Sequence, residues 1–327
     1  MERNQKPNSG PGSAVLSVVV PIFNEADSLL SLLTELVPYC LDHKWMLILV
    51  NDGSSDETPA ILKDYEEYPD IKIIHHKVNR GYGGALKTGL LNADTQYVVT
   101  IDADGQHELS DLAELLRFTL EKDADLVVGN RGKQGSSGLY RNFGRWMIRN
   151  FAALLMPVHI SDLNSGFKLY QTKLVQRYLS ICPDSMAFSD VITLIFIKKR
   201  HLVLEHPIIN KKRVTGKSTI NTYTAIQTVM EIINIAMLFN PLRIFLSLSV
   251  LCIGFGFVWG IPILLRARGV SVGAMLAIVT GLLFFFIGLI AEQLSAMRLG
   301  LLDTNNDHDA PCDLLSKSNR DYHEGSH

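Results

Sequence analysis

Two carboxylates and one amide follow the apolar run at residues 97–100. They are Asp102, Asp104 and Gln106, and Gly105 allows the backbone to turn between them. Carboxylate and amide oxygens suit Mg²⁺ or Mn²⁺, so Asp104 and Gln106 can share one cation with Asp102 nearby. Two protein ligands would leave coordination positions for water and for the phosphates of a substrate. The alternative is a turn stabilised by Asx hydrogen bonding, with its carboxylates in water.

A second carboxylate, Asp52, precedes a turn glycine in the polar segment 51–58. Ser55 or Asp56 can cap the helix that follows, and Glu57 suits its first turn, so capping explains half of the segment. Asp52 stands ahead of these capping positions, where a carboxylate can bond a ribose hydroxyl or a base edge. A purely structural role for Asp52 is an equal alternative.

The glycine-rich segment 81–89, GYGGALKTG, matches neither common phosphate-binding loop. The dinucleotide-binding fingerprint GxGxxG follows the first strand of its domain, and the first strand here lacks it. The spacing GxxxxGK[ST] is also missing from the segment. A weak phosphate cradle and a flexible connection therefore both stand as interpretations.

These polar segments stand at the ends of apolar strands in an alternating pattern of strands and helices. The predicted strands are residues 15–20, 46–50, 71–76, 97–102 and 124–129. The predicted helices between them are residues 26–37, 57–68, 83–93 and 109–122, and the first places Leu29, Leu32, Leu33 and Leu36 on one face. Apolar strands separated by amphipathic helices predict a parallel sheet covered on both faces. Ligands of such sheets bind beyond the carboxyl ends of the strands, where the polar segments gather.

The bulk composition excludes several classes of protein. The 327 residues carry a formal net charge of −2, which argues against a general nucleic-acid-binding protein, since such proteins carry a basic excess. The four cysteines are scattered without CxxC spacing, which is typical of neither a disulfide framework nor a zinc site and suits a reducing compartment. Residues 1–14 are polar and rich in Pro and Gly, and we expect a disordered lead-in there instead of a signal peptide.

Two uncharged apolar stretches, residues 244–265 and 270–291, are predicted to be transmembrane helices. Each has 22 residues, or about 33 Å as a helix, which matches a bilayer core of about 30 Å. The alternative is a pair of buried core helices, but uncharged stretches longer than about 18 residues usually span membranes. We therefore expect a soluble domain followed by a membrane hairpin at 241–298 and a polar tail at 299–327.

The orientation of this hairpin is predicted from charge and from the missing signal peptide. The basic residues within 198–213 and the unpaired cysteines favour a cytoplasmic soluble domain with both termini on the same side, although two arginines between the spans weaken the charge asymmetry. Residues 222–240 place apolar side chains on one helical face and indicate an interfacial helix. Packing of that helix against the catalytic domain or a neighbouring subunit is an equal alternative.

Six segments, in this order, resemble family 2 glycosyltransferases of GT-A fold, and more narrowly the dolichyl-phosphate mannose synthase-like polyprenyl-phosphate glycosyltransferases. They are VVVPIFNEADSL, LVNDGSSDET, NRGYGGALKTGL, IDADGQH, GNR and DLNSGFKLY. The resemblance covers residues 15–221, and the C-terminal hairpin fits a subset of the group. It implies an α/β fold in which a GT-A (Rossmann-like), mostly parallel sheet domain precedes a two-helix transmembrane hairpin.

The resemblance also implies roles for individual residues. The nucleotide-sugar pocket would be formed by Pro21, Phe23, Glu25, Asp52 and Asp102, with Arg213 and Lys217 binding phosphates from a loop. The divalent metal, Mg²⁺ or Mn²⁺, would be held by Asp102, Asp104 and Gln106. The catalytic group would comprise Asp104, Arg131 and Asp162, with Asp162 beside the reacting sugar. The acceptor phosphate would meet Arg131. The residues themselves add Arg141 and Arg145, which form a helical stripe with Arg149; this stripe faces either lipid phosphates or, as an equal alternative, solvent.

The sequence departs from the family pattern at a few positions. Gly105 and Glu108 stand where Leu and Pro are frequent, and Lys168 stands where Arg is usual after SGF. The GKST order at 216–219 is looser than the usual Ser-Lys pairing. These departures concern the acceptor side more than the metal site.

The implied reaction transfers a sugar, with inversion, from a UDP- or GDP-sugar to a polyprenyl (undecaprenyl or dolichyl) phosphate. A phosphate monoester has a second pKa of about 6, so at neutral pH it needs cationic partners more than a general base. We therefore expect Asp162 to orient or polarise and to play only a minor part in proton abstraction. The resemblance further implies an integral protein of the bacterial inner membrane and allows homo-oligomers.

Two other functions fit the same residues. A family 2 transferase with a glycan or glycerolipid acceptor is one, although the QxxRW motif of processive synthases is missing from this sequence. A non-catalytic membrane module that binds nucleotide sugars is the other. Binding that depends on Mn²⁺, without turnover on any lipid phosphate, would favour the second of these.

Overall fold

The computed structural model describes residues 14–132, 160–163, 165–209, 237, 239–266 and 269–304. The chain divides into two compact units, Met1–Ile233 and Asn234–His327. The predicted lead-in at 1–14 and interfacial helix at 222–240 lie almost wholly outside the described residues, as does most of the tail at 299–327.

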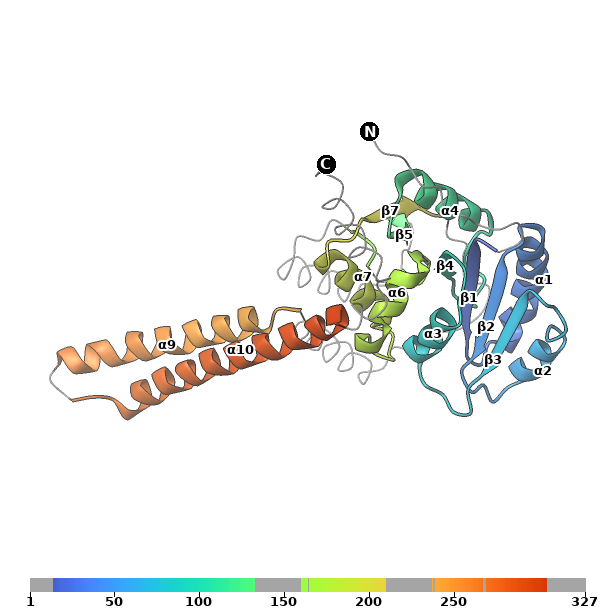
Figure 1. The fold of residues 1–327 in the computed structure, drawn as a ribbon. Coiled ribbons are helices and arrows are strands. Elements are labelled where there is room, and N and C mark those ends of the chain that lie inside the picture. Colours follow the sequence, from blue (N-terminus) through green and yellow to red (C-terminus); the bar gives the residue numbers. More distant parts are fainter. Residues whose placement is uncertain are drawn as a thin grey trace, which may run out of the picture. The chain divides into compact units, whose positions relative to one another are not determined.

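The first unit is built on a seven-stranded sheet of order β3-β2-β1-β4-β6-β5-β7 (Figure 1). Its strands are β1 (Leu16–Ile22), β2 (Met46–Asn51), β3 (Ile71–His75), β4 (Tyr97–Thr100), β5 (Leu126–Asn130), β6 (Lys168–Gln171) and β7 (Val203–Pro207). All neighbours pair in parallel except β6, which runs antiparallel to both β4 and β5. The sheet is therefore mostly parallel, as predicted, and the five predicted strands are all present.

Two strands, β6 and β7, are absent from the sequence-based prediction. β6 has four residues and opens with a lysine, and β7 has the sequence VLEHP with no fully buried residue. Neither shows the continuous apolar run that identifies the other strands. Their place in the sheet is decided by pairing with β4 and β5, which are distant in sequence.

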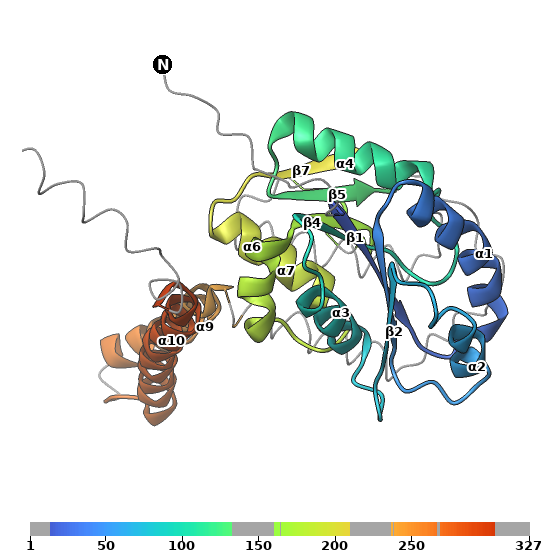
Figure 2. The same ribbon diagram turned by 45° about the vertical axis from the view of Figure 1, so that its right-hand side comes forward.

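Helices cover both faces of the sheet (Figures 1 and 2). One face carries α1 (Ala26–Asp42), α2 (Thr58–Lys63) and α4 (Ser110–Lys122), and the other carries α3 (Tyr82–Leu91), α6 (Thr172–Tyr178) and α7 (Phe188–Lys198), with the short helix η2 (Leu179–Ile181) after α6. Alternate β1 residues face opposite layers, so that Val18 and Val20 join the core under α1 while Val19 does not. This layering leaves the carboxyl ends of the central strands to carry the site.

The helix predictions hold in part. The predicted face of α1 is confirmed, because Leu29, Leu32, Leu33 and Leu36 are all buried. The helix predicted at 57–68 is too long, since α2 ends at Lys63 and turns follow it. Pro69 disfavours helical backbone in Tyr68, the residue before it, which speaks against the predicted end of the helix at residue 68.

The second unit is a hairpin of two long apolar helices, α9 (Pro241–Leu265) and α10 (Val272–Thr304). Two segments, Pro241–Leu265 and Val272–Arg298, are long and apolar enough to cross a membrane, and only 11% and 17% of their most apolar windows are buried. The core helix of a soluble protein would bury most of its apolar side chains, whereas these helices expose them. The pattern fits a hairpin surrounded by lipid and indicates membrane association.

Candidate active site

Asp102 lies just beyond β4 and is held by two side chains. The Tyr82 hydroxyl donates a hydrogen bond of 2.8 Å to Oδ1, and His107 Nε2 lies 3.9 Å from Oδ2. Burial by itself would raise the pKa of Asp102, but His107, Tyr82 and the charge of Arg131 lower it below the usual value. Asp102 is therefore ionised at neutral pH, as a metal-binding carboxylate must be.

The same loop carries Asp104 and Gln106, the other two predicted metal ligands. The Gln106 N–H donates to Asp104 Oδ1 at 3.2 Å, and Gly105 between them has φ of +68°. Asx hydrogen bonding is therefore present in this turn, as the alternative interpretation expected. The ionised Asp102 carboxylate lies two residues before Asp104. Two carboxylates and an amide are hard oxygen donors that fit Mg²⁺ or Mn²⁺.

Within the part of the chain that the structure describes, no group of three or more His, Cys, Asp and Glu side chains could hold a metal ion. The predicted set is consistent with this finding, because it contains only two carboxylates. Such a set holds a cation when water and substrate phosphates supply the remaining oxygens. Asp102, Asp104 and Gln106 therefore stay a prediction for the ligands of a metal bound together with a diphosphate.

Gly166 approaches the Asp102 carboxylate so closely that no larger residue fits without movement. A Cβ added at Gly166 would lie 2.6 and 2.7 Å from the two Asp102 oxygens and 2.8 Å from the Tyr82 hydroxyl oxygen. The Gly166 carbonyl accepts a 2.7 Å hydrogen bond from Thr100 at the end of β4, which fixes the backbone there. The glycine of the SGF segment therefore makes room for the carboxylate.

Asp52 is buried and bonds to the chain itself. Its Oδ1 accepts from His76 Nδ1 at 2.6 Å and from the Arg80 N–H at 2.8 Å, and its Oδ2 accepts from the Gly81 N–H at 2.8 Å. Gly81 has φ of +85°, which favours glycine, and α3 begins directly after it. The glycine-rich segment is thus held in place by Asp52. Oδ2 accepts one of the three bonds described, so the contact of Asp52 with a nucleotide, which stays a prediction, would use its remaining acceptor site.

The other predicted pocket residues gather at the end of β1. Pro21 is buried in the strand, and Phe23 just beyond it is 46% exposed. The Glu25 carboxylate accepts a 2.8 Å hydrogen bond from Ser28, and the Glu25 N–H donates to Thr58 at 3.3 Å. This edge therefore presents one exposed aromatic face and one acidic group, and their contact with a nucleotide stays a prediction.

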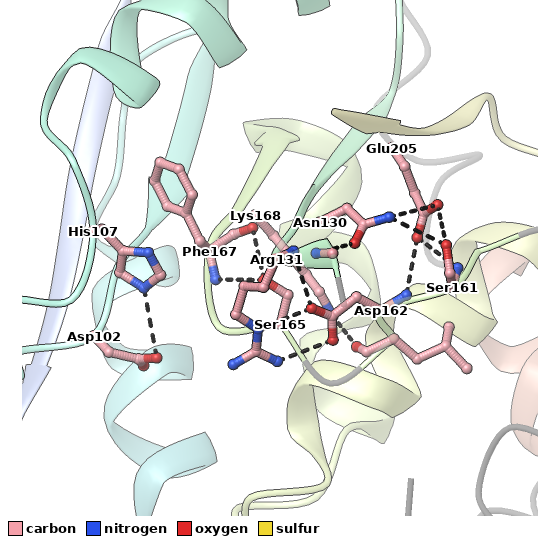
Figure 3. Close-up of polar contacts among 12 residues, drawn as sticks. Asp102, His107, Asn130, Arg131, Ser161, Asp162, Ser165, Phe167, Lys168 and Glu205 are labelled. Atoms are coloured by element: carbon pink, nitrogen blue, oxygen red, sulfur yellow. Dashed lines mark hydrogen bonds and ion pairs between the residues drawn. The ribbon is translucent and has the colours of Figure 1, made fainter. Parts of the chain in front are cut away.

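Arg131 and Asp162 form a two-pronged ion pair (Figure 3). Arg131 Nε donates to Asp162 Oδ2 at 2.8 Å, and Nη2 donates to Oδ1 at 2.9 Å. Burial would raise the pKa of Asp162, but the hydrogen bonds and charge of Arg131 lower it. The same pairing raises the pKa of Arg131. Residues 31 positions apart in sequence, both predicted to be catalytic, are therefore brought together and both charged.

Lys168 is fully buried beside this pair, at the start of β6. Its Nζ donates to the Leu163 carbonyl at 2.7 Å, to the Thr193 hydroxyl at 2.8 Å and to the Ser189 carbonyl. Burial lowers the pKa of Lys168 to about 8, against the opposing charges of Asp190 and Asp162. The lysine that departs from the family pattern therefore joins the loop after Asp162 to α7.

We expect Lys168→Met to lower the free energy of unfolding by about 3 kcal/mol, because three acceptors lose their donor. The loss should grow with pH. The folded protein releases the Lys168 proton near pH 8, whereas the unfolded chain keeps it to the ordinary value of 10.5. Between these values the unfolded state binds more protons, so the wild type gains stability as pH rises and the variant does not. Denaturant unfolding in detergent at pH 7 and 9.5 measures the free energy of unfolding of both proteins. If the difference between wild type and Lys168→Met is the same at both pH values, the lowered pKa of Lys168 is contradicted.

Four predicted site residues lie outside the described residues: Arg141, Arg145, Arg213 and Lys217. Their predicted contacts with phosphates remain predictions. Sequence reasoning assigned no role in the site to Tyr82, His76 or Glu205, which hold Asp102, Asp52 and the segment around Asp162 in place. His76 and Glu205 have no motif around them, and Tyr82 lies in the glycine-rich segment 81–89 without any sign in the sequence that it contacts Asp102, so only their neighbours in the fold reveal these roles.

Comparison with protein families finds two matches along the chain. The glycosyl transferase family 2 model matches residues 17–187, and the GtrB C-terminal hairpin model matches residues 240–297. The first match spans more than half of the chain and contains Asp52, Asp102, Arg131 and Asp162. The second coincides with the hairpin of α9 and α10.

Curated relatives point the same way. A dolichyl-phosphate beta-glucosyltransferase of Dictyostelium discoideum is 29% identical over 67% of this chain and 73% of its own length. An undecaprenyl-phosphate 4-deoxy-4-formamido-L-arabinose transferase of Photorhabdus laumondii is 28% identical over 85% of this chain and 88% of its own. Both relatives are polyprenyl-phosphate glycosyltransferases.

Solved structures support the fold. Glucosyl-3-phosphoglycerate synthase of Mycobacterium tuberculosis, in complex with Mn²⁺, UDP and phosphoglyceric acid, superposes with a TM-score of 0.52 at 17% identity, covering 68% of this chain and 78% of the other. At this identity the likeness concerns the GT-A architecture. With its sheet, its acidic strand end and its apolar hairpin, the chain belongs to glycosyl transferase family 2, in the group of polyprenyl-phosphate sugar transferases.

Proposed function

We propose that this protein is a membrane-bound inverting glycosyltransferase that depends on Mg²⁺ or Mn²⁺. It moves a sugar from a UDP- or GDP-sugar to a polyprenyl phosphate at the cytoplasmic face of the membrane. The observation that carries the proposal is the meeting of two charged groups at one edge of the sheet. Asp102 lies just beyond the carboxyl end of β4, and the Arg131–Asp162 pair lies just beyond the carboxyl end of β5, which runs in the same direction as β4. An anionic donor and an anionic acceptor need such a juxtaposition of metal-binding and cationic groups.

The relatives support both substrates. The curated proteins named above act on dolichyl phosphate and undecaprenyl phosphate, and the mycobacterial synthase binds UDP with Mn²⁺. The apolar hairpin gives a reason for the lipid acceptor, because a polyprenyl tail stays in the bilayer and the enzyme must work at its surface. We place the catalytic domain and both termini in the cytoplasm of a bacterial cell, with the hairpin in the inner membrane and homo-oligomers allowed.

The donor would lie along the ends of β1, β2 and β4. Asp102, Asp104 and Gln106 would hold the divalent cation. That cation would neutralise charge on the leaving nucleoside diphosphate. Phe23 offers an exposed ring for stacking against a base. Asp52 fixes the glycine-rich turn by accepting hydrogen bonds from the Arg80 and Gly81 N–H groups.

The acceptor would meet Arg131. A phosphate monoester is mostly dianionic at pH 7, so it attacks the anomeric carbon without losing a proton to the protein. Asp162 has a lowered pKa, which makes it a weak base. Its two hydrogen bonds to Arg131 instead fix the plane of the guanidinium for the incoming phosphate. A single direct displacement of this kind inverts the configuration of the anomeric carbon.

The proposal is tested by incubating membranes that contain the protein with a panel of labelled UDP- and GDP-sugars, undecaprenyl phosphate and Mg²⁺ or Mn²⁺. We expect label in the chloroform-extractable lipid for at least one donor, and loss of that label with EDTA. The anomeric configuration of the product, read by NMR, tests inversion. Mn²⁺-dependent nucleotide binding with no lipid product from any donor would overturn the proposal and favour a non-catalytic binding module.

Asp162→Asn should lower kcat by about 30-fold, because the amide keeps the shape but weakens the hold on Arg131. This loss should be smaller than that of Asp104→Ala, since Asp162 orients a cation and removes no proton. Initial rates at saturating donor, with the acceptor varied, measure both variants. Equal losses in the two variants would show that Asp162 does more than orient, for example as a general base.

A further inference from the structure

We propose that Glu205, on β7, is a positioning residue that sets the Arg131–Asp162 pair from both of its sides. Glu205 lies outside every motif of the sequence. The effect of Glu205 on catalysis rests on the proposed function, whereas the hydrogen bonds by which it holds the segment around Asp162 do not depend on that function.

The Glu205 carboxylate accepts hydrogen bonds from the segment that carries Asp162. Its Oε1 accepts from the Ser161 N–H at 2.5 Å and from the Asp162 N–H at 2.9 Å, and its Oε2 accepts from the Ser161 hydroxyl at 2.6 Å. Figure 3 shows the carboxylate above these donors, with the Asp162 side chain turned away from it toward Arg131. Two successive backbone N–H groups are thus fixed by one carboxylate oxygen.

The same carboxylate also reaches the strand end that carries Arg131. Asn130 Nδ2 donates to Glu205 Oε2 at 3.3 Å and to the Ser161 hydroxyl at 3.2 Å, and Asn130 Oδ1 accepts from the Gly132 N–H at 2.8 Å. Asn130 directly precedes Arg131, and Ser161 directly precedes Asp162. Glu205 therefore fixes the residue before each member of the ion pair.

The sheet explains why Glu205 is placed to do this. β7 pairs in parallel with β5, and Glu205 stands opposite Val128, two residues before Asn130. β7 is the edge strand of the sheet, so the segment 160–163 crosses beside it with its N–H groups in need of acceptors. The Glu205 side chain reaches from β7 to the segment 160–163, and its carboxylate can accept hydrogen bonds from several donors at once.

Charge explains why an acidic residue suits this place although Asp162 is acidic too. All the contacts of Glu205 given above are with N–H or O–H donors, and hydrogen bonds to a carboxylate are stronger than those between neutral groups. The Asp162 carboxylate is neutralised separately by Arg131. A displacement of about 1 Å at a reacting group can cost about 100-fold in rate, so an anchor of this kind matters for catalysis.

The anchor is tested first without any substrate, by residue-level amide hydrogen exchange of the full chain in detergent. We expect the Ser161 and Asp162 amides of Glu205→Ala to exchange about 10-fold faster than in the wild type. In Glu205→Gln the side-chain oxygen can take the place of Oε1 and keep both backbone bonds, so protection should largely return. Glu121→Gln, at an exposed glutamate of α4 paired with Lys122, is the matched control and should change neither amide.

The catalytic consequence is tested in the labelled-lipid assay with a double-mutant cycle. Glu205→Ala should lower kcat by about 10-fold with the KM for donor unchanged within about 2-fold, and Glu205→Gln should recover most of that loss. In an Asp162→Asn background, Glu205→Ala should cost less than about 2-fold, because the group that it positions has already been changed. A role confined to stability would lower the unfolding midpoint and give independent effects in the cycle.

The outcomes separate this inference from the proposed function. Unchanged exchange at Ser161 and Asp162 in Glu205→Ala, or additive losses in the cycle, would overturn the positioning role even if lipid-linked sugar is formed. A wild type that makes no lipid-linked product would overturn the proposed function, and the exchange experiment would still decide whether Glu205 fixes the segment.

Discussion

Asp104→Ala should lower the rate of sugar transfer by about 1,000-fold, or about 4 kcal/mol of barrier. The side chain stands in the loop beyond β4, two residues from the ionised Asp102. With only two carboxylates in the predicted set, loss of one leaves a cation with a single charged protein ligand. The donor diphosphate would then lose most of its charge neutralisation as the leaving group departs.

Asp104→Asn separates this role from the hydrogen bond that Asp104 Oδ1 accepts from the Gln106 N–H. The amide oxygen keeps that bond and the turn but lacks the charge, so activity should stay low if Asp104 holds a metal. The measurement is initial rate against Mn²⁺ concentration, together with Mn²⁺ binding in the presence of UDP. The control is Asp64→Asn, at an exposed carboxylate just after α2. Near-normal activity in Asp104→Asn would show that Asp104 stabilises the turn and does not bind a metal ion.

Gly166→Ala should lower activity by about 100-fold while leaving the fold intact. The added methyl would stand 2.6 to 2.8 Å from the Asp102 oxygens and the Tyr82 hydroxyl oxygen, so these must move. Both are tips of side chains, which shift more cheaply than backbone. The substitution should therefore displace the Asp102 carboxylate and lower the free energy of unfolding by at most about 2 kcal/mol.

Gly254→Ala is the matched control, because a Cβ at Gly254 meets no atom within 4 Å. Rates, Mn²⁺ binding in the presence of UDP, and denaturant unfolding are compared for the two variants. We expect weaker Mn²⁺ binding and lower activity only in Gly166→Ala. If Gly166→Ala unfolds the protein or leaves activity unchanged, the close approach to Asp102 is not what the glycine serves.

The sequence alone determined the architecture, because its signals are local. The apolar runs at β1, β2, β3, β4 and β5 and the leucine face of α1 repeat with the periods of their elements. Polar residues at the carboxyl ends of those strands then had to meet at one edge of the sheet. The three predicted metal ligands, Asp102, Asp104 and Gln106, could be grouped for the same reason, since they lie within five positions of the sequence, although the strand predicted at 97–102 ends at Thr100 and leaves Asp102 in the loop.

Only the tertiary structure decided which polar groups meet. Asp52 accepts hydrogen bonds from the Arg80 and Gly81 N–H groups, and Glu205 accepts them from Asn130 and Ser161, over separations of 28 to 75 positions. No periodicity encodes such pairs, because a hydrogen bond depends on the direction and distance of two groups in space and one polar residue looks like another in sequence. β6 and β7 were missed for the same physical reason, since their four and five residues are held by pairing with strands far along the chain.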